Sequence, residues 1–256
     1  MQFAGATARR RQDSPDRSSR DLAPQLRRRR CALRFASAAA FATLAATAKA
    51  QLVGSIGLDS DYRYRGVSLS RSEPSVRATL NYDAPERWYA GALATRAALA
   101  PSETYTQLSG YAGWTTARSD GRSFEIGVDA SHFAGASSYD FGELYLGVLA
   151  ERWNARLSWS PDYYGQQVQV AYLESNGYAP LDRNLRLFAH LGVLVPLAGA
   201  SGDAAKTRFD ASLGAGVVLS RWDLHVAATG ATADGPYPAV YSGRRATVVV
   251  GVAVSF

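Results

Sequence analysis

The sequence predicts an all-β fold, a transmembrane antiparallel up-and-down β-barrel of about twelve strands. After residue 50, apolar and polar side chains alternate with a period of two, and turn residues interrupt the pattern about every 8 to 12 positions. No run of about 18 apolar residues, which a membrane-spanning helix needs, follows residue 50. The C-terminal stretch TVVVGVAVSF shows the alternation clearly, because one of its two rows is Val248, Val250, Val252, Val254 and Phe256. Successive side chains of a strand point to opposite faces, so this row forms one apolar face.

The same sorting by odd and even positions can be applied along the whole chain. The predicted strands are residues 52–65, 75–83, 88–99, 103–114, 123–132, 140–150, 152–160, 166–174, 184–195, 207–219, 222–231 and 244–256. In each strand one row is apolar and, apart from positions at the strand ends, contains no Asp, Glu, Lys or Arg. This row includes Tyr62 and Tyr64 in the first strand. It runs from Tyr89 to Leu99 in the third strand, and it is Val168, Val170 and Tyr172 in the eighth.

The opposite rows carry the charges, in nearly balanced numbers. They hold nine arginines, at positions 63, 65, 77, 96, 152, 156, 186, 208 and 245, and eight acids, at positions 59, 61, 103, 125, 129, 143, 210 and 223. Near balance argues against strong ion selectivity. The residues expected to line a pore are Asp59, Asp61, Arg63, Arg65, Arg77, Glu125, Asp129, Arg156, Arg186 and Asp210.

A soluble β-sandwich or lipocalin-like barrel would alternate in the same way. Its apolar row would face inward, and its outer surface would be rich in Lys and Glu. Here the only lysine after residue 50 is Lys206, in a predicted loop. The apolar rows are therefore expected to face lipid, with the charged rows around a narrow lumen.

Aromatic residues support a membrane barrel. An even number of strands leaves both termini in the periplasm. Tyr82, Trp114, Trp153, Trp222 and Phe256 then fall at that rim, all in the apolar row, as an interfacial girdle requires. Phe256 also fits the terminal aromatic residue of an outer-membrane assembly signal, which implies the barrel-assembly machinery as a partner. The loops expected outside the cell are 68–74, 196–206 and 232–243.

The first 50 residues are expected to be a signal peptide with an extended basic N-terminal region. Arg27 to Arg30 precede the small-residue apolar stretch 35–48, and Ala48-Lys49-Ala50 fits the A-x-A cleavage pattern. Cleavage after Ala50 would send the barrel, residues 51–256, through the periplasm to a Gram-negative outer membrane. Eleven of the 28 Lys and Arg and three of the 22 Asp and Glu precede residue 51. The remainder has a net charge of −2 and gives no reason to expect nucleic acid.

Residues 59–93 resemble the opening of the TorF-type porins of proteobacteria, a family whose function is largely inferred. The matching residues are Ser60-Asp61-Tyr62-Arg63-Tyr64-Arg65-Gly66, then Ser68, Pro74 and Tyr89-Ala90-Gly91. Leu69 and Ser75 depart from the family pattern, which has Gln and Ala there. The resemblance implies a porin-like role and no particular solute.

Catalytic and metal motifs do not emerge from the sequence. The three histidines, His132, His190 and His225, form no H-E-x-x-H motif, and no G-x-S-x-G motif is present. We expect no enzyme and no cofactor. The first interpretation is a porin-like channel for small solutes or ions, embedded in outer-membrane lipid. The alternative is a closed barrel with a structural or adhesion role.

Overall fold

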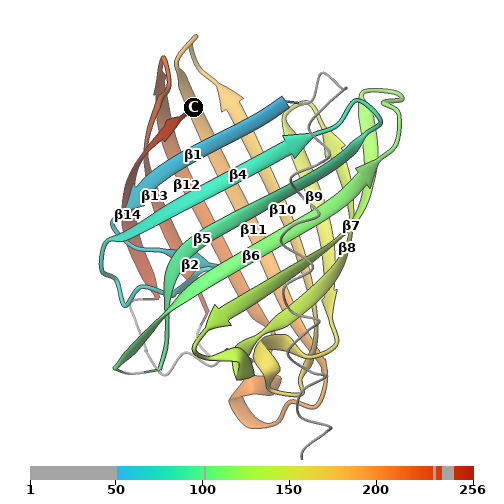
Figure 1. Ribbon diagram of the computed structural model, residues 1–256, viewed down its shortest axis with the longest axis vertical. Coiled ribbons are helices and arrows are strands. Elements are labelled where there is room, and N and C mark those ends of the chain that lie inside the picture. Colours follow the sequence, from blue (N-terminus) through green and yellow to red (C-terminus); the bar gives the residue numbers. More distant parts are fainter. Residues whose placement is uncertain (1–50, 101, 233–234, 238–244) are drawn as a thin grey trace, which may run out of the picture. The chain divides into compact units, whose positions relative to one another are not determined.

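The computed structural model describes residues 51–100, 102–232, 235–237 and 245–256, which form a closed antiparallel β-barrel of twelve strands. The barrel strands are β1 (Gln51–Asp59), β4 (Ser75–Asp83), β5 (Trp88–Ala100), β6 (Glu103–Thr115), β7 (Arg122–Ala134), β8 (Phe141–Ala150), β9 (Trp153–Ser160), β10 (Gln169–Pro180), β11 (Leu185–Ala198), β12 (Arg208–Leu219), β13 (Trp222–Ala231) and β14 (Ala246–Ser255). Each strand pairs with its neighbours in sequence order. The predicted up-and-down barrel is confirmed (Figure 1). The predicted signal peptide, residues 1–50, lies outside the described residues.

The barrel closes where β1 meets β14. Ser55 pairs with Ser255 and Asp59 with Gly251, so Gln51 and Phe256 lie at the same end of the barrel. Three 3₁₀ turns lie at the other end: η1 (Ser137–Tyr139), η2 (Tyr163–Gly165) and η3 (Gly202–Ala205). In the described residues, no helix is long and apolar enough to cross a membrane.

The outer wall is apolar, as expected. Leu191, Leu213 and Val248 are 65%, 64% and 61% exposed, and all belong to the predicted lipid-facing rows. Trp153, Trp222 and Phe256 are exposed at the end that carries the termini. A wall of this kind is stable only against hydrocarbon, so the barrel is a transmembrane one.

The predicted faces of strand 88–99 are reversed. Arg77 pairs with Thr95, and Asp83 pairs with Tyr89, so the row from Tyr89 to Leu99 faces the lumen. Trp88 and Arg96 lie in the other row, which is exposed on the outer wall. Arg96 is therefore not a lumen residue. The inward row is apolar because Ala97 and Leu99 pack against other apolar side chains inside the barrel.

The predicted faces of strand 166–174 are also reversed. Val170 and Tyr172 are 0% and 1% exposed inside the barrel, and Leu173, opposite Leu157, faces outward. Glu174 is opposite Arg156 and faces the lumen. A row that packs against protein inside the barrel has the same composition as one that faces lipid.

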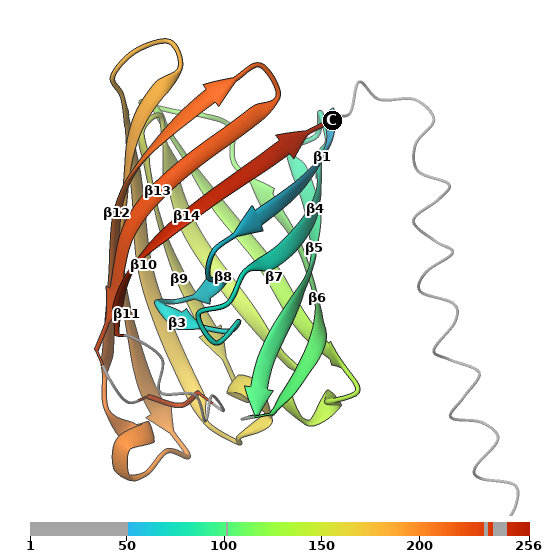
Figure 2. The same ribbon diagram turned by 90° about the vertical axis from the view of Figure 1, so that its left-hand side faces the viewer.

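The first strand is shorter than predicted, because it ends at Asp59. Residues 60–74, called the inner segment below, turn into the barrel and return at Ser75, the direct partner of Asp59 (Figure 2). The inner segment contains a small hairpin of β2 (Arg63–Tyr64) and β3 (Val67–Ser68). The expectations that Tyr62 and Tyr64 face lipid, and that residues 68–74 form an external loop, are therefore wrong.

The hydrophobic core lies inside the barrel, at the end opposite the termini. The inner segment contributes Tyr62, Val67 and Leu69 to it. The surrounding strands and turns contribute Ala97, Leu99, Phe133, Ala136, Phe141, Tyr163, Tyr164, Val168, Val170, Tyr172 and Leu194. Burial raises the pKa of the Tyr163 and Tyr164 phenols well above the ordinary value, so both stay neutral. This core fixes the inner segment across the lumen.

Candidate functional site

The candidate site is the lumen, and Asp61 organises the inner segment within it. The Asp61 carboxylate accepts hydrogen bonds from Arg63 Nε at 2.8 Å, Ser68 Oγ at 2.5 Å and Ser70 Oγ at 3.0 Å. Arg63 also donates to the Gly66 carbonyl at 2.8 Å. These bonds lie within the segment, so Asp61 and Arg63 hold its shape.

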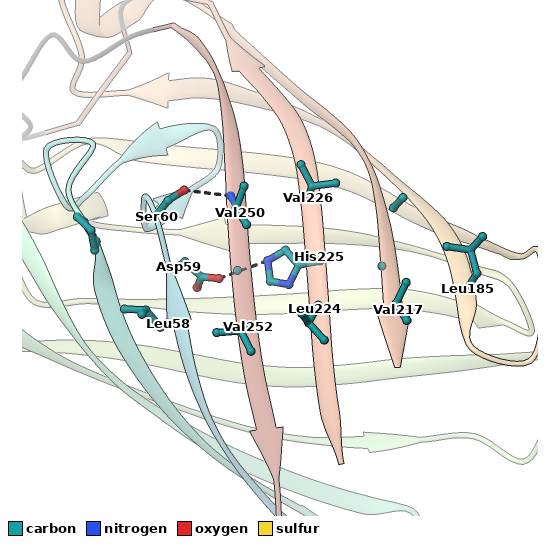
Figure 3. A pocket seen from close by; sticks show the side chains of 14 residues that line it. Leu58, Asp59, Ser60, Leu185, Val217, Leu224, His225, Val226, Val250 and Val252 are labelled. Carbon is teal, nitrogen blue, oxygen red and sulfur yellow. Dashed lines mark hydrogen bonds and ion pairs between the residues drawn. The ribbon is translucent and has the colours of Figure 1, made fainter. Parts of the chain in front are cut away.

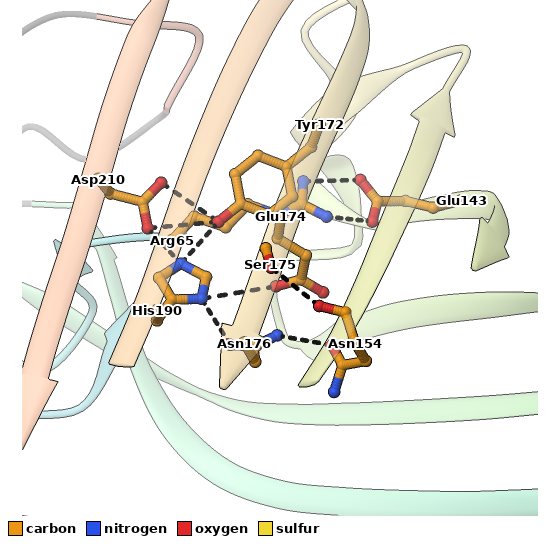
Figure 4. Close-up of polar contacts among 9 residues, drawn as sticks. All are labelled: Arg65, Glu143, Asn154, Tyr172, Glu174, Ser175, Asn176, His190 and Asp210. Atoms are coloured by element: carbon orange, nitrogen blue, oxygen red, sulfur yellow. Dashed lines mark hydrogen bonds and ion pairs between the residues drawn. The ribbon is translucent and has the colours of Figure 1, made fainter. Parts of the chain in front are cut away.

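Arg65 ties the inner segment to the barrel wall. Its guanidinium donates to both carboxylate oxygens of Glu143, at 2.8 and 2.5 Å, with side chains 8% and 1% exposed. The same group lies 4.0 Å from the ring centroid of Tyr172, where a cation–π contact adds to the ion pair. Figure 4 shows Arg65 bonded to Glu143, and Tyr172 bonded to Asp210 and His190.

Gly66 allows the segment to turn close to the wall formed by β12 and β13. Its φ is +75°, and a Cβ there would lie 2.6 Å from Asp210 Cβ and 2.7 Å from Ala231 Cβ. Any other residue would be strained at this φ and would clash with both neighbours.

Further bonds hold the segment to the strands on the β5 side. Tyr62 donates its hydroxyl to Gln107 Oε1 at 3.2 Å, and the Ala98 amide donates to the Leu69 carbonyl at 2.6 Å. Arg71 donates to the carbonyls of Ala100 and Glu103 at 2.6 and 2.7 Å. The inner segment is thus anchored on opposite sides of the barrel.

Between the inner segment and the end that carries the termini, charged side chains pair along the inside of the wall. Glu125 accepts from Arg156 Nε at 2.9 Å and from the Tyr89 hydroxyl at 2.6 Å. Arg186 bonds Asp223 at 2.7 Å. Asp59 lies 3.3 Å from both Arg77 and His225. Asp59 and Arg77 lie on neighbouring strands, and each of the other pairs reaches across one intervening strand.

A polar cavity of about 210 Å³ lies between the inner segment and this part of the wall. It is lined by Arg63, Tyr64, Arg65, Asp129, Arg156, Ser158, Tyr172, Glu174 and His190. The lining comes from the segment and from strands β7, β9, β10 and β11. A solute moving along the lumen would meet guanidinium, carboxylate and phenol groups together here.

A second hollow, of about 570 Å³, is lined mostly by apolar residues of β1 and β11 to β14, such as Leu58, Leu224 and Val250, with Asp59 and His225 also at its edge. Figure 3 shows it at the end of β1, where Ser60 Oγ accepts from the Val250 amide at 3.0 Å. The apolar lining makes it part of the lipid-facing wall.

All ten predicted pore residues lie inside the barrel. Asp59, Arg77, Glu125, Asp129, Arg156, Arg186 and Asp210 stand on strands, and Asp61, Arg63 and Arg65 stand on the inner segment. Sequence reasoning missed Glu174 and Tyr172, because the faces of their strand were reversed. The placement of Glu174 opposite Arg156 becomes visible only with the true register.

The histidines bond to carboxylates. His132 Nδ1 lies 2.7 Å from Asp140 at the rim, and His190 Nε2 lies 2.7 Å from Asp210. Among the described residues, no serine hydroxyl is hydrogen-bonded to a histidine, and no group of three or more side chains could hold a metal ion.

Solved porins share this fold. A KdgM porin superposes with a TM-score of 0.52 at 11% identity, over 80% of this chain and 99% of the porin. A KdgM porin in complex with disordered oligogalacturonate gives 0.51 at 11% identity, with the same coverage. The NanC porin gives 0.51 at 10% identity, over 80% and 99% of the two chains. At such low identity the likeness shows the fold alone.

No curated protein matches the chain by sequence. A family model described as a bacterial protein of unknown function (Gcw_chp) matches residues 43–256. The match spans all twelve strands and the inner segment, and the chain belongs to this family.

Proposed function

We propose that the protein is an outer-membrane channel for passive passage of small solutes or ions, narrowed by the inner segment. The observation that carries this proposal is the charged, partly open cavity beneath that segment, inside a wall that is apolar outside. Eight strands enclose a bore filled by side chains, and 16 to 18 leave an open channel. Twelve strands leave room for the inner segment and a narrow path beside it.

The same proposal covers location and biogenesis. Residues 1–50 would direct export, and Phe256 would be read by the barrel-assembly machinery before insertion into outer-membrane lipid. The TorF-type identity is also part of the proposal. It rests on the stretch Ser60 to Gly66, which in this structure builds the inner segment. The proposed channel works without catalysis, in keeping with histidines that, among the described residues, bond to carboxylates and not to a serine hydroxyl.

The channel can be tested by removing the inner segment. Because Asp59 and Ser75 are direct partners, replacing residues 61–73 by Asn-Gly should leave the β1–β4 pair intact. In planar bilayers we expect low conductance from the wild type and conductance several-fold higher from this variant. The matched control replaces residues 201–205, in the η3 connection at the same end, and should conduct like the wild type.

The closed-barrel alternative is favoured by the hydrophobic core that the inner segment builds across the lumen. A wild type and a 61–73 variant that both insert and carry no current would contradict the channel. That result would favour a structural or adhesion role.

A further inference from the structure

Most charges inside the lumen cancel in pairs. The side chains between the two rims include six arginines, at positions 63, 65, 77, 156, 186 and 208, and eight acids, at positions 59, 61, 125, 129, 143, 174, 210 and 223. Five arginines form ion pairs, in the order given, with Asp61, Glu143, Asp59, Glu125 and Asp223. Arg208 lies two residues from Asp210 in the same inward row of β12.

Of the three other acids, Asp210 bonds to His190 and to the Tyr172 hydroxyl, which leaves Asp129 and Glu174. Among the described residues Asp129 makes no ion pair within 4 Å, and Glu174 has only His190 Nδ1, at 3.9 Å. That nitrogen lies 2.7 Å from Asn176 Oδ1, and the other ring nitrogen lies 2.7 Å from Asp210. His190 is thus already engaged by closer partners. Both carboxylates therefore keep hydrogen-bonding capacity for the lumen.

The two carboxylates border the same cavity. Asp129 stands on β7 and Glu174 on β10, with β8 and β9 between them in the wall. The arginines of that cavity, Arg63, Arg65 and Arg156, are each bound to a carboxylate. The inner segment confines the passage at this level. A fixed charge in a confined, weakly screened passage acts strongly on a passing ion.

We propose that the channel prefers cations, and that Asp129 and Glu174 set this preference. The inference rests on the proposed function and goes beyond it, since near balance of the lumen charges predicts little selectivity. The surplus appears because Arg96 faces outward, Glu174 faces inward, and Arg152, Arg245 and Glu103 lie at the rims. The pair acts as fixed charges on small cations in transit, such as alkali-metal ions.

The test is the reversal potential in a KCl gradient at pH 8, measured in planar bilayers. For the wild type we expect a potassium-to-chloride permeability ratio of roughly ten, the lower end of what focused surface charge achieves. Asp129→Asn with Glu174→Gln should bring the ratio close to one. Arg77→Gln, which frees Asp59, should raise the ratio above that of the wild type.

The matched control removes two charges outside the lumen, by Asp120→Asn with Asp182→Asn in exposed turns at the end that carries the termini. It should keep the wild-type ratio. If the lumen double variant does not insert, each single variant should lower the ratio part of the way. A wild type without cation preference, or lumen variants with an unchanged ratio, would overturn the inference alone. Absence of current from the wild type and from the 61–73 variant would overturn the channel itself.

Discussion

Arg65 and Glu143, 78 residues apart in the chain, form a two-bonded ion pair inside the barrel, at 2.8 and 2.5 Å. Breaking a buried pair by removing one partner costs about 3 to 5 kcal/mol, because the remaining charge is left without compensation. If Arg65 is replaced, the buried charge of Glu143 can regain solvent only if the inner segment moves away from it. The ion pair therefore makes the position of the segment sensitive to a single substitution.

Arg65→Gln is expected to loosen the inner segment without unfolding the barrel. The measurement is limited trypsin digestion of the folded protein, with cleavage after Arg71 as the readout. Arg71 is held to the wall by carbonyls of β5 and β6 and should become accessible when the segment moves. The double variant with Glu143→Gln should be cleaved more slowly than Arg65→Gln, because two neutral amides replace the lone carboxylate. Equal cleavage rates for Arg65→Gln and the wild type would show that the ion pair does not hold the segment.

Neighbouring residues of β14 test the assignment of faces. Val250 is 56% exposed on the outer wall, whereas Val249 points into the lumen. An arginine facing lipid near the bilayer midplane costs about 2 to 4 kcal/mol. Val250→Arg should therefore lower the folded fraction in a urea titration, and Val249→Arg should be the milder change. The reverse order would mean that β14 is turned the other way.

Phe256 is expected to control the rate of barrel closure. Its amide and carbonyl exchange hydrogen bonds with Gly54, both at 3.0 Å, at the seam between β1 and β14. Its ring also lies against Gly54. Deleting Phe256 should slow assembly into lipid vesicles, followed by the shift in electrophoretic mobility of unheated samples. Phe256→Tyr is the control and should assemble at the wild-type rate.

Signal cleavage after Ala50 predicts a mature chain that begins at Gln51, the first residue of β1. Intact-mass measurement of protein extracted from outer membranes will show whether residues 1–50 are absent. A mass that includes residues 35–48 would contradict cleavage at this site.

The barrel itself could be predicted because lipid and water act on alternate residues of the same strand. The inner segment could not, because an apolar row that packs against protein resembles one that faces lipid. Tyr62 and Tyr64 continue the alternation of β1 beyond Asp59, although the chain there has already turned inward. Val170 and Tyr172 pack against that segment, so the more apolar row of β10 faces in. Charge favours the lumen side for Asp59, Arg77 and Glu125, but Arg96 shows that charge alone does not decide the face of a strand residue.

The inner segment also fixes an order of events during assembly. It lies between the first two strands of the barrel, yet Glu143 and Tyr172, which it contacts, belong to strands that come much later in the sequence. A Cβ at Gly66 would lie 2.7 Å from Ala231 Cβ, on the second-last strand. Contacts between such distant parts of a chain form slowly. The segment therefore gains these contacts only when the sheet has curved into a barrel. It must lie inside that sheet before β1 and β14 pair. If β1 and β14 paired before that, residues 60–74, fifteen residues in all, would remain outside the closed barrel.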